Sequence, residues 1–322
     1  MKRALSKAAP FLKVVFGVGI VAWMASSGRL NLAQVARSLS RWPIMLAMAG
    51  LAYSQVAITV WRWRLLLEAQ EIRLSYRRAW GLTMIGMLFN VVIPGAVGGD
   101  LVKGYYIARA ASGRKSHAAT TVLMDRVAGL IGLLFVGAVM VVAHLGETMR
   151  SAATRGLGIM TVGGLAGGLV GLYAAVFAGE RLSAWHFLPG FLRNVCRALH
   201  EYRRKSRVIP IALALSVVNQ GLGCGMYYLA LRASGVADMP MGQFFLVVPL
   251  GMVTSAIPIS PGGVGVGQAA FFTLFQIVAP QYASVGADAL TVFQVVFLLI
   301  CLNGLYWYFS YQHVDLDYGR QK

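Results

Sequence analysis

The twenty residues NVVIPGAVGGDLVKGYYIAR, Asn90–Arg109, decide how this chain is organised. They begin as an apolar run and are then interrupted by a proline and three glycines, followed by an aspartate and a lysine. Because Gly permits positive φ and Pro removes a backbone donor, the pattern predicts a break between two helices. Such a break at membrane depth is tolerated only where the backbone is buried in protein or lines a wet cavity.

The composition is that of a membrane protein. The 322 residues are 58% hydrophobic and only 12% charged, whereas a soluble domain has about 25% charged residues. The 29 Lys and Arg against 11 Asp and Glu lie between apolar runs, which the positive-inside rule explains better than nucleic-acid binding. Three widely spaced cysteines and five histidines show no ligand spacing, so we expect no metal and no cofactor.

Six apolar segments are predicted to cross the membrane completely, since about 20 apolar residues are needed to span it. The first resembles a signal peptide, but we interpret it as a retained span because more apolar segments follow. The six segments are Phe11–Ser26, Pro43–Val60, Ala118–Leu145, Leu157–Ala178, Val208–Leu231 and Leu290–Tyr311.

Two further apolar regions, Ala79–Ala110 and Met241–Val278, have Pro and paired Gly in their middle. If the first region crossed once, the most basic loops would lie outside, whereas a return to the same side places them inside. We therefore predict an all-α polytopic membrane domain, 1–322, with six full spans, two re-entrant hairpins and both termini cytoplasmic. The expected location is the bacterial inner (plasma) membrane. The first hairpin and its span occupy residues 79–145, and the second hairpin and its span occupy 241–311.

The two interrupted regions share a motif. IPGAVGG, which begins at Ile93, and IPISPGG, which begins at Ile257, both read I-P-x-x-x-G-G. The charge count places the two hairpins on opposite faces, which predicts an inverted repeat of the kind found in secondary transporters, with a binding site near the broken segments. The residues expected to break the hairpins are Pro94, Gly98, Gly99, Pro258, Pro261, Gly262 and Gly263.

Four ionisable residues follow the first break. Asp100 and Lys103 are spaced i,i+3 and can share a helix face, whereas Asp125 and Arg126 are adjacent and need separate partners. Ionisable groups inside a membrane are expensive and usually functional. Two interpretations stay open: Lys103 and Arg126 hold an anionic lipid headgroup while the aspartates set their geometry, or an aspartate pairs with one of these cations and locks the first hairpin.

Two more residues complete the candidate headgroup site, Arg109 and Gln268. Gln268 either hydrogen-bonds a headgroup or satisfies backbone freed near the glycine turns. Amide side chains in neighbouring spans are expected to bond between helices instead. These are Asn219, Gln220, Gln294 and Asn303.

A basic stretch, Leu182–Arg207, is predicted to contain an interfacial cytoplasmic helix. Its apolar residues follow helical spacing, and its arginines lie mostly on other faces, which is typical of a helix lying on an anionic leaflet. A solvated connector that obeys the positive-inside rule is the alternative.

Enzyme motifs give no catalytic residue. Asp315-Leu316-Asp317 is a D-x-D, but no nucleotide-binding domain surrounds it, and the glycines from Gly262 to Gly267 lack a βαβ unit. G-x-S-x-G, H-E-x-x-H and C-x-x-C do not occur in the sequence.

The two glycine motifs resemble those of the lysylphosphatidylglycerol synthase transmembrane-region family, a flippase-like membrane domain. The first motif is P-x-x-x-G-G-D, a basic residue and a later V-L-x-D-R, matched from Pro94 to Arg126. The second, P-x-S-P-G-G-x-G, is matched from Pro258 to Gly265. The chain departs from the common pattern at Lys103, where Arg is commoner, and at Gly267-Gln268, where Arg-Glu is common.

The resemblance implies lipid handling: movement of a polar, anionic or modified lipid between leaflets, with membrane lipids as partners and no nucleic acid. Aminoacylation is not expected, because only about eleven residues follow the last span. Two alternatives are a membrane enzyme and a non-catalytic accessory subunit of a lipid, hopanoid or polyprenyl-glycan pathway, bound to an enzyme of that pathway. The oligomeric state is not predicted.

Overall fold

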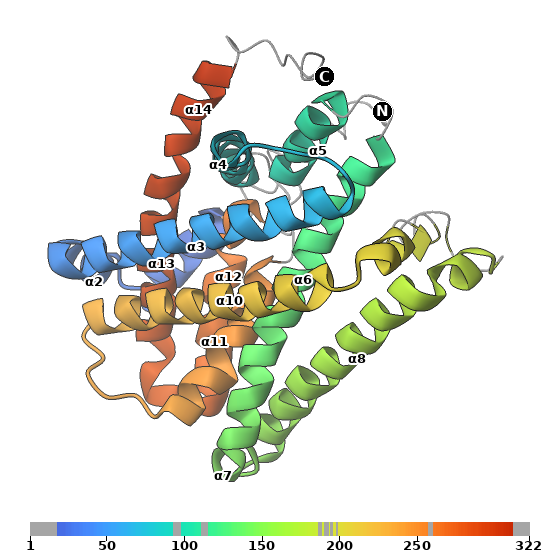
Figure 1. The fold of residues 1–322 in the computed structure, drawn as a ribbon. Coiled ribbons are helices and arrows are strands. Elements are labelled where there is room, and N and C mark those ends of the chain that lie inside the picture. Colours follow the sequence, from blue (N-terminus) through green and yellow to red (C-terminus); the bar gives the residue numbers. More distant parts are fainter. Residues whose placement is uncertain are drawn as a thin grey trace, which may run out of the picture.

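The computed structural model describes residues 18–92, 98–110, 115–185, 189, 193, 196–197, 199–256 and 260–311, and these residues form helices without any strand (Figure 1). The first part contains α2 (Leu32–Leu39), α3 (Trp42–Ala69), α4 (Tyr76–Val92), α5 (Gly98–Ala110), α6 (Lys115–Ala143), α7 (Leu145–Thr148) and α8 (Ala152–Ser183). The second part contains η1 (Glu201–Lys205), α10 (Val208–Ala233), α11 (Met241–Ala256), η2 (Pro261–Gly263), α12 (Val266–Val278), η3 (Pro280–Tyr282), α13 (Ala283–Cys301) and α14 (Asn303–Tyr311). The predicted all-α class is confirmed.

Five helical segments of the described chain are long and apolar enough to cross a membrane. They are Trp42–Ala69, Thr120–Ala143, Ala152–Ser183, Val208–Ala233 and Pro280–Ser310. Each corresponds to one of the six predicted spans. Of the sixth prediction, Phe11–Ser26, only residues 18–26 are described, and these are helical.

The helix α3 continues past Val60, the predicted end of its span, and ends at Ala69. Its apolar face continues through Trp63, Leu66 and Leu67, which are fully buried. The helix therefore keeps packing on the bundle beyond Val60, although polar residues follow there in the sequence. The extension carries Arg62 into the interior of the bundle.

The region predicted as the first hairpin folds as two antiparallel helices, α4 and α5, here called the first helix pair. Asn90, near the end of α4, accepts a 2.9 Å hydrogen bond from the amide of Gly99 at the start of α5. Earlier on α4, Gly86 packs against the side chain of Lys103, later on α5. A Cβ at Gly99 would overlap the carbonyl oxygen of Gly86, so the two backbones touch here and only glycine fits.

The second helix pair, α11 and α12, packs in the same way. Gly251 lies against the ring of Phe271, and Ser255 lies against Gly267, so these helices also run antiparallel. The turn between them contains Gly262, Gly263 and Gly265 at φ +57°, +73° and +82°, a region open mainly to glycine. Of the predicted breaking residues, Pro94 and Pro258 lie outside the described residues. Re-entry of either pair into the membrane stays a prediction.

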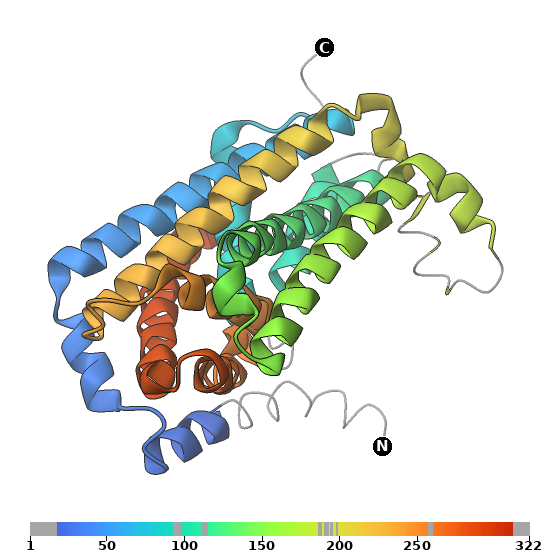
Figure 2. The ribbon, with the colours of Figure 1, turned by 90° about the horizontal axis from the view of Figure 1, so that it is seen from below.

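The helices α3 and α10 lie side by side through the bundle (Figure 1). α11 packs on α6, and α4 packs on α13 and α14, so each helix pair contacts the long helix that follows the other pair. α8 lies at the edge of the bundle beside α6 (Figure 2). Large buried aromatic side chains fill the core, among them Trp63, Tyr227, Phe244, Phe271 and Phe275.

Candidate functional site

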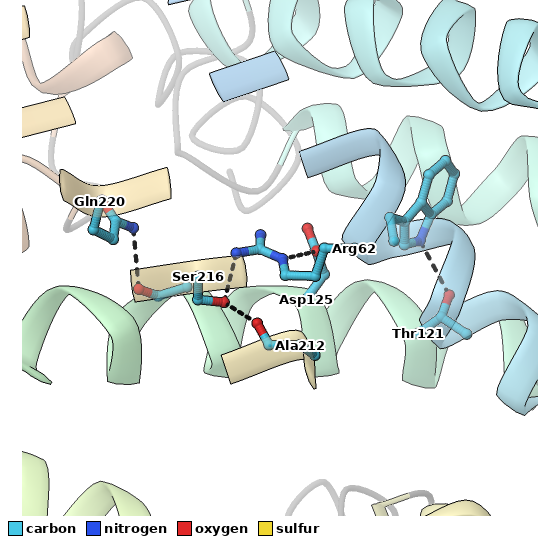
Figure 3. A network of polar contacts seen from close by, with 8 residues as sticks. Arg62, Thr121, Asp125, Ala212, Ser216 and Gln220 are labelled. Carbon is cyan, nitrogen blue, oxygen red and sulfur yellow. Dashed lines mark hydrogen bonds and ion pairs between the residues drawn. The ribbon is translucent and has the colours of Figure 1, made fainter. Parts of the chain in front are cut away.

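A buried ion pair joins α3 to α6. Nε of Arg62 lies 2.8 Å from Oδ1 of Asp125, and the two residues are only 4% and 8% exposed. The guanidinium of Arg62 also donates to Oγ of Ser216 on α10 at 2.8 Å, and that hydroxyl donates to the carbonyl of Ala212 (Figure 3). Gln220, one turn further along α10, donates to the carbonyl of Gly129 at 3.0 Å. These bonds fix three long helices to one another.

A second ion pair joins α5 to α6. Nε of Arg126 lies 2.5 Å from Oδ2 of Asp100, and the Arg126 side chain is about half exposed, 48%. Asp100 lies in the first turn of α5, where the helix dipole favours a carboxylate. As expected from their adjacency, Asp125 and Arg126 have separate partners, and the pairing of an aspartate with Arg126 exists.

The ammonium of Lys103 has a different environment. Lys103 is 6% exposed, and its Nζ lies 4.1 Å from the centre of the Trp63 ring, a cation–π distance. Trp63 is itself oriented by a 3.3 Å bond from its indole N–H to Oγ1 of Thr121. Among the described residues, no carboxylate forms an ion pair with Lys103. Both nearby aspartates are bound to arginines instead.

The second helix pair repeats the link between its second helix and the following span. Nε2 of Gln268 on α12 donates to Oε1 of Gln294 on α13 at 2.7 Å. In the numbering of the chain, Gln268 follows Asp100 by the same interval as Gln294 follows Arg126, and Asp100 and Arg126 form the ion pair of the first helix pair. A hydrogen bond between two neutral side-chain amides therefore occupies the positions that the ion pair has in the first helix pair.

A ring contact is repeated as well. Phe271 follows Lys103 by that same interval, and its ring centre is 4.8 Å from that of Tyr227 on α10. Tyr227 in turn follows Trp63 by the interval that separates the two I-P-x-x-x-G-G motifs. The ring contact between Phe271 and Tyr227 thus stands at the positions that the cation–π contact between Lys103 and Trp63 has in the first half.

One predicted site residue, Gln268, does not join the charged network. Gln268 accepts from the amide of Gly265 at 2.7 Å and donates to Thr291 and Gln294, so its polar atoms satisfy the glycine turn and the neighbouring span. This favours the internal interpretation over a headgroup contact. Arg109 lies on α5, and its side chain is outside the described ones.

Sequence reasoning missed Arg62, Trp63 and Ser216. Arg62 lies just beyond Val60, where the apolar run and the predicted span end. The need of Asp125 for a partner elsewhere was a signal, but it did not identify which of the many arginines supplies the charge.

η1 packs beside the end of α3 that carries the network. The hydroxyl of Tyr202 donates to the carbonyl of Leu66 at 3.3 Å, and burial raises the pKa of Tyr202, which keeps it protonated as a donor. Nδ1 of His117 on α6 lies 3.0 Å from a carboxylate oxygen of Glu201. Leu199 is buried in one hydrophobic cluster with Tyr202 and Leu66, so this part of the predicted interfacial segment packs on the bundle.

An all-helical, multi-pass membrane protein with a charged network between its helices is the class that these features define. The chain matches the family described as the lysylphosphatidylglycerol synthase TM region over residues 11–308, and it belongs to that family. It is also similar to a protein named "UPF0104 membrane protein" from Methanothermobacter thermautotrophicus, with 23% identity over 281 residues covering 78% of this chain and 81% of that protein. No solved structure matches the chain. The expected family is therefore confirmed, and it is a family of lipid metabolism.

Proposed function

We propose that the protein moves a lipid with a polar, anionic or modified headgroup between the leaflets of the bacterial inner membrane. The headgroup is held at Lys103, between the first helix pair and α3, while the acyl chains stay in the surrounding lipid. Arg126, half exposed beside Asp100, provides the outer cation of the same site.

The observation that carries the proposal is the ammonium of Lys103. Two carboxylates and two guanidiniums in this network neutralise each other as Arg62–Asp125 and Arg126–Asp100. One positive charge is left over in this count, and the ammonium of Lys103, which has no ion pair of its own among the described side chains, lies over the Trp63 ring. An uncompensated buried charge is costly. A phosphate or carboxylate of a headgroup would supply the missing countercharge.

The relation between the two helix pairs supports alternating access of the headgroup to the two leaflets. The ion pair, the amide pair and the two ring contacts recur at matching positions, and each helix pair packs on the long helix that follows the other. Such reciprocal packing is what a two-fold relation produces. We infer an inverted repeat whose two halves open the headgroup site at Lys103 alternately to the two leaflets, as in secondary transporters.

The test uses the purified protein in proteoliposomes and measures exchange of headgroup-labelled phosphatidylglycerol between leaflets. Lys103→Met keeps the length of the side chain and removes its charge, so we expect exchange to fall by an order of magnitude or more, about the effect of one buried charge contact. Arg73→Met, at an exposed loop position, is the matched control and should exchange lipid at the unmodified rate.

Two outcomes would overturn the proposal: no exchange of any lipid class, or full exchange by Lys103→Met. Lipid extracts from a deletion strain separate the alternatives. A missing lipid product supports a synthetic or accessory role, whereas a product that accumulates on the inner leaflet supports translocation.

A further inference from the structure

Asp288 is a buried carboxyl outside the charged network. It lies on α13, more than a turn after the helix begins at Ala283, and it is only 2% exposed. Its Oδ1 accepts a 2.7 Å hydrogen bond from the backbone amide of Asn31. The segment Pro280–Ser310, which is long and apolar enough to cross a membrane, contains it, and ionisable residues in such segments are usually functional.

Among the side chains that the structure describes, no cation neutralises Asp288. None of the ion pairs within the described ranges includes it. Arg29, two residues before its hydrogen-bond partner, stacks instead on Trp23 and Phe272, at 4.4 Å and 5.4 Å from the ring centres. The hydroxyl of Tyr227 on α10 donates to the carbonyl of Gly286 at 2.7 Å and is thereby directed to the backbone.

Within the described residues, none of the ionisable groups on the other elements packed on α13 forms an ion pair with Asp288. Besides Tyr227, α10 has Cys224, Tyr228 and Arg232, and Arg232 donates to the carbonyl of Ala237. α12 has none, and α14 and η3 have only tyrosines. α2 has the exposed Arg37, which donates to the carbonyl of Ala33. The ionisable groups of α3 and α4 are Tyr53, Arg62, Arg64, Glu68, Tyr76, Arg77 and Arg78; Arg62 and Arg64 are each paired with a carboxylate.

We propose that Asp288 is a proton-binding site that couples the lipid movement proposed above to a transmembrane proton gradient. The ligand is a proton, which converts the carboxylate to a carboxylic acid. The acid keeps one carbonyl oxygen for the amide of Asn31, so binding the proton does not break the contact. Burying a carboxylate whose one partner is a neutral donor costs far more than burying the neutral acid.

Residues 24–31, which cover Asp288, provide the route by which the proton is released. Met24 and Leu30 pack on Ala287, next to Asp288, and form a small cluster of their own. Movement of residues 24–31 away from α13 would admit water and remove the hydrogen bond from Asn31 in the same step. Proton release and movement of this segment are therefore one event.

The first measurement reads the proton directly. Infrared difference spectra of the reconstituted protein between acidic and alkaline buffer should contain a carboxylic-acid carbonyl band that shifts in heavy water. Asp288→Asn should lack this band while keeping an acceptor oxygen for Asn31, and Asp238→Asn, at an exposed loop position, should keep it. A spectrum in which Asp288→Asn removes no band overturns the proposal.

The second measurement reads coupling. The inference rests on the proposed function, so exchange of phosphatidylglycerol is measured in proteoliposomes with and without a pH gradient. The ratio of the two rates should exceed one for the unmodified protein and for Asp238→Asn, and should equal one for Asp288→Asn. A ratio of one in the unmodified protein, or a ratio above one in Asp288→Asn, overturns the coupling. If no lipid moves in any sample, the proposed function fails, and the infrared titration alone decides on the proton site.

Discussion

The two helix pairs share a geometry and differ in chemistry. In the first pair, Asp100 and Arg126 form an ion pair, whereas the side-chain amides of Gln268 and Gln294 form a neutral hydrogen bond at the matching positions of the second pair. The first pair places a lysine over an indole, and the second places a phenylalanine on a tyrosine. The bridging contacts are thus common to both helix pairs, and at these matching positions only the first pair has charged side chains.

This difference assigns the two halves different tasks. An anion would meet complementary charge only at the first helix pair, because the second pair has no ionisable side chain on α11 or α12. The second pair is better suited to rigid packing, with Phe271 and Phe275 fully buried. We therefore expect substitutions in the two halves to separate transport from stability.

The largest effect is expected at Arg62, which has no charged counterpart in the second half. Arg62→Met leaves the carboxylate of Asp125 buried and unpaired, and breaking such a pair costs about 3–5 kcal/mol. Denaturant unfolding in detergent should show this loss of stability.

Two variants make the test of Arg62 specific. Adding Asp125→Asn to Arg62→Met should restore most of the stability, because no buried charge is then left. Arg64→Met removes a partly exposed pair with Glu68 at i,i+4 and a hydrogen bond from Nε to the carbonyl of Leu74, and it should cost only about 1–1.5 kcal/mol. If Arg62→Met costs no more than Arg64→Met, the buried pair does not hold the helices together.

The next effect tests whether the amide pair and the ion pair are equivalent. Gln268→Glu places a carboxylate at a position 1% exposed and removes the donor to Thr291 and Gln294, so we expect a loss of about 2–3 kcal/mol. Adding Gln294→Arg should recover most of that loss by recreating the arrangement of Asp100 and Arg126. Unfolding of both variants by the same denaturant decides, and a double variant less stable than the single one would break the comparison.

The sequence predicted the fold where periodic apolar runs and glycine breaks carry the information. Paired Gly and Pro located both helix pairs, since few other residues allow such a turn or such a close approach of backbones. The end of α3 was missed because Arg62 reads as the start of a loop, although Trp63, Leu66 and Leu67 continue its buried face.

The candidate site was predicted in part for a related reason. Asp100, Lys103, Asp125 and Arg126 were found because charge within apolar sequence is conspicuous. Which charges pair is a long-range fact: Arg62 and Asp125 are 63 residues apart, and nothing local links them. The match of Gln268 and Gln294 to Asp100 and Arg126 was hidden because amides replace charges, and because the second turn is longer than the first.

The last set of variants compares how tightly the two helix pairs are packed. Gly99→Ala drives a Cβ into the backbone carbonyl of Gly86, which cannot move without shifting α4, so we expect a loss of about 3 kcal/mol. Gly267→Ala, at the matching position, meets the side chains of Ser255 and Leu290 at 2.8 Å and 3.0 Å. Side chains can rotate away, so we expect a loss of only about 1 kcal/mol. Gly104→Ala on α5 meets nothing within 4 Å and should stabilise its helix by about 0.5–1 kcal/mol. Unfolding midpoints in the same detergent rank the three variants. Equal losses for Gly99→Ala and Gly267→Ala would mean that both pairs adjust alike, and the tighter backbone contact of the charged half would then have no energetic consequence.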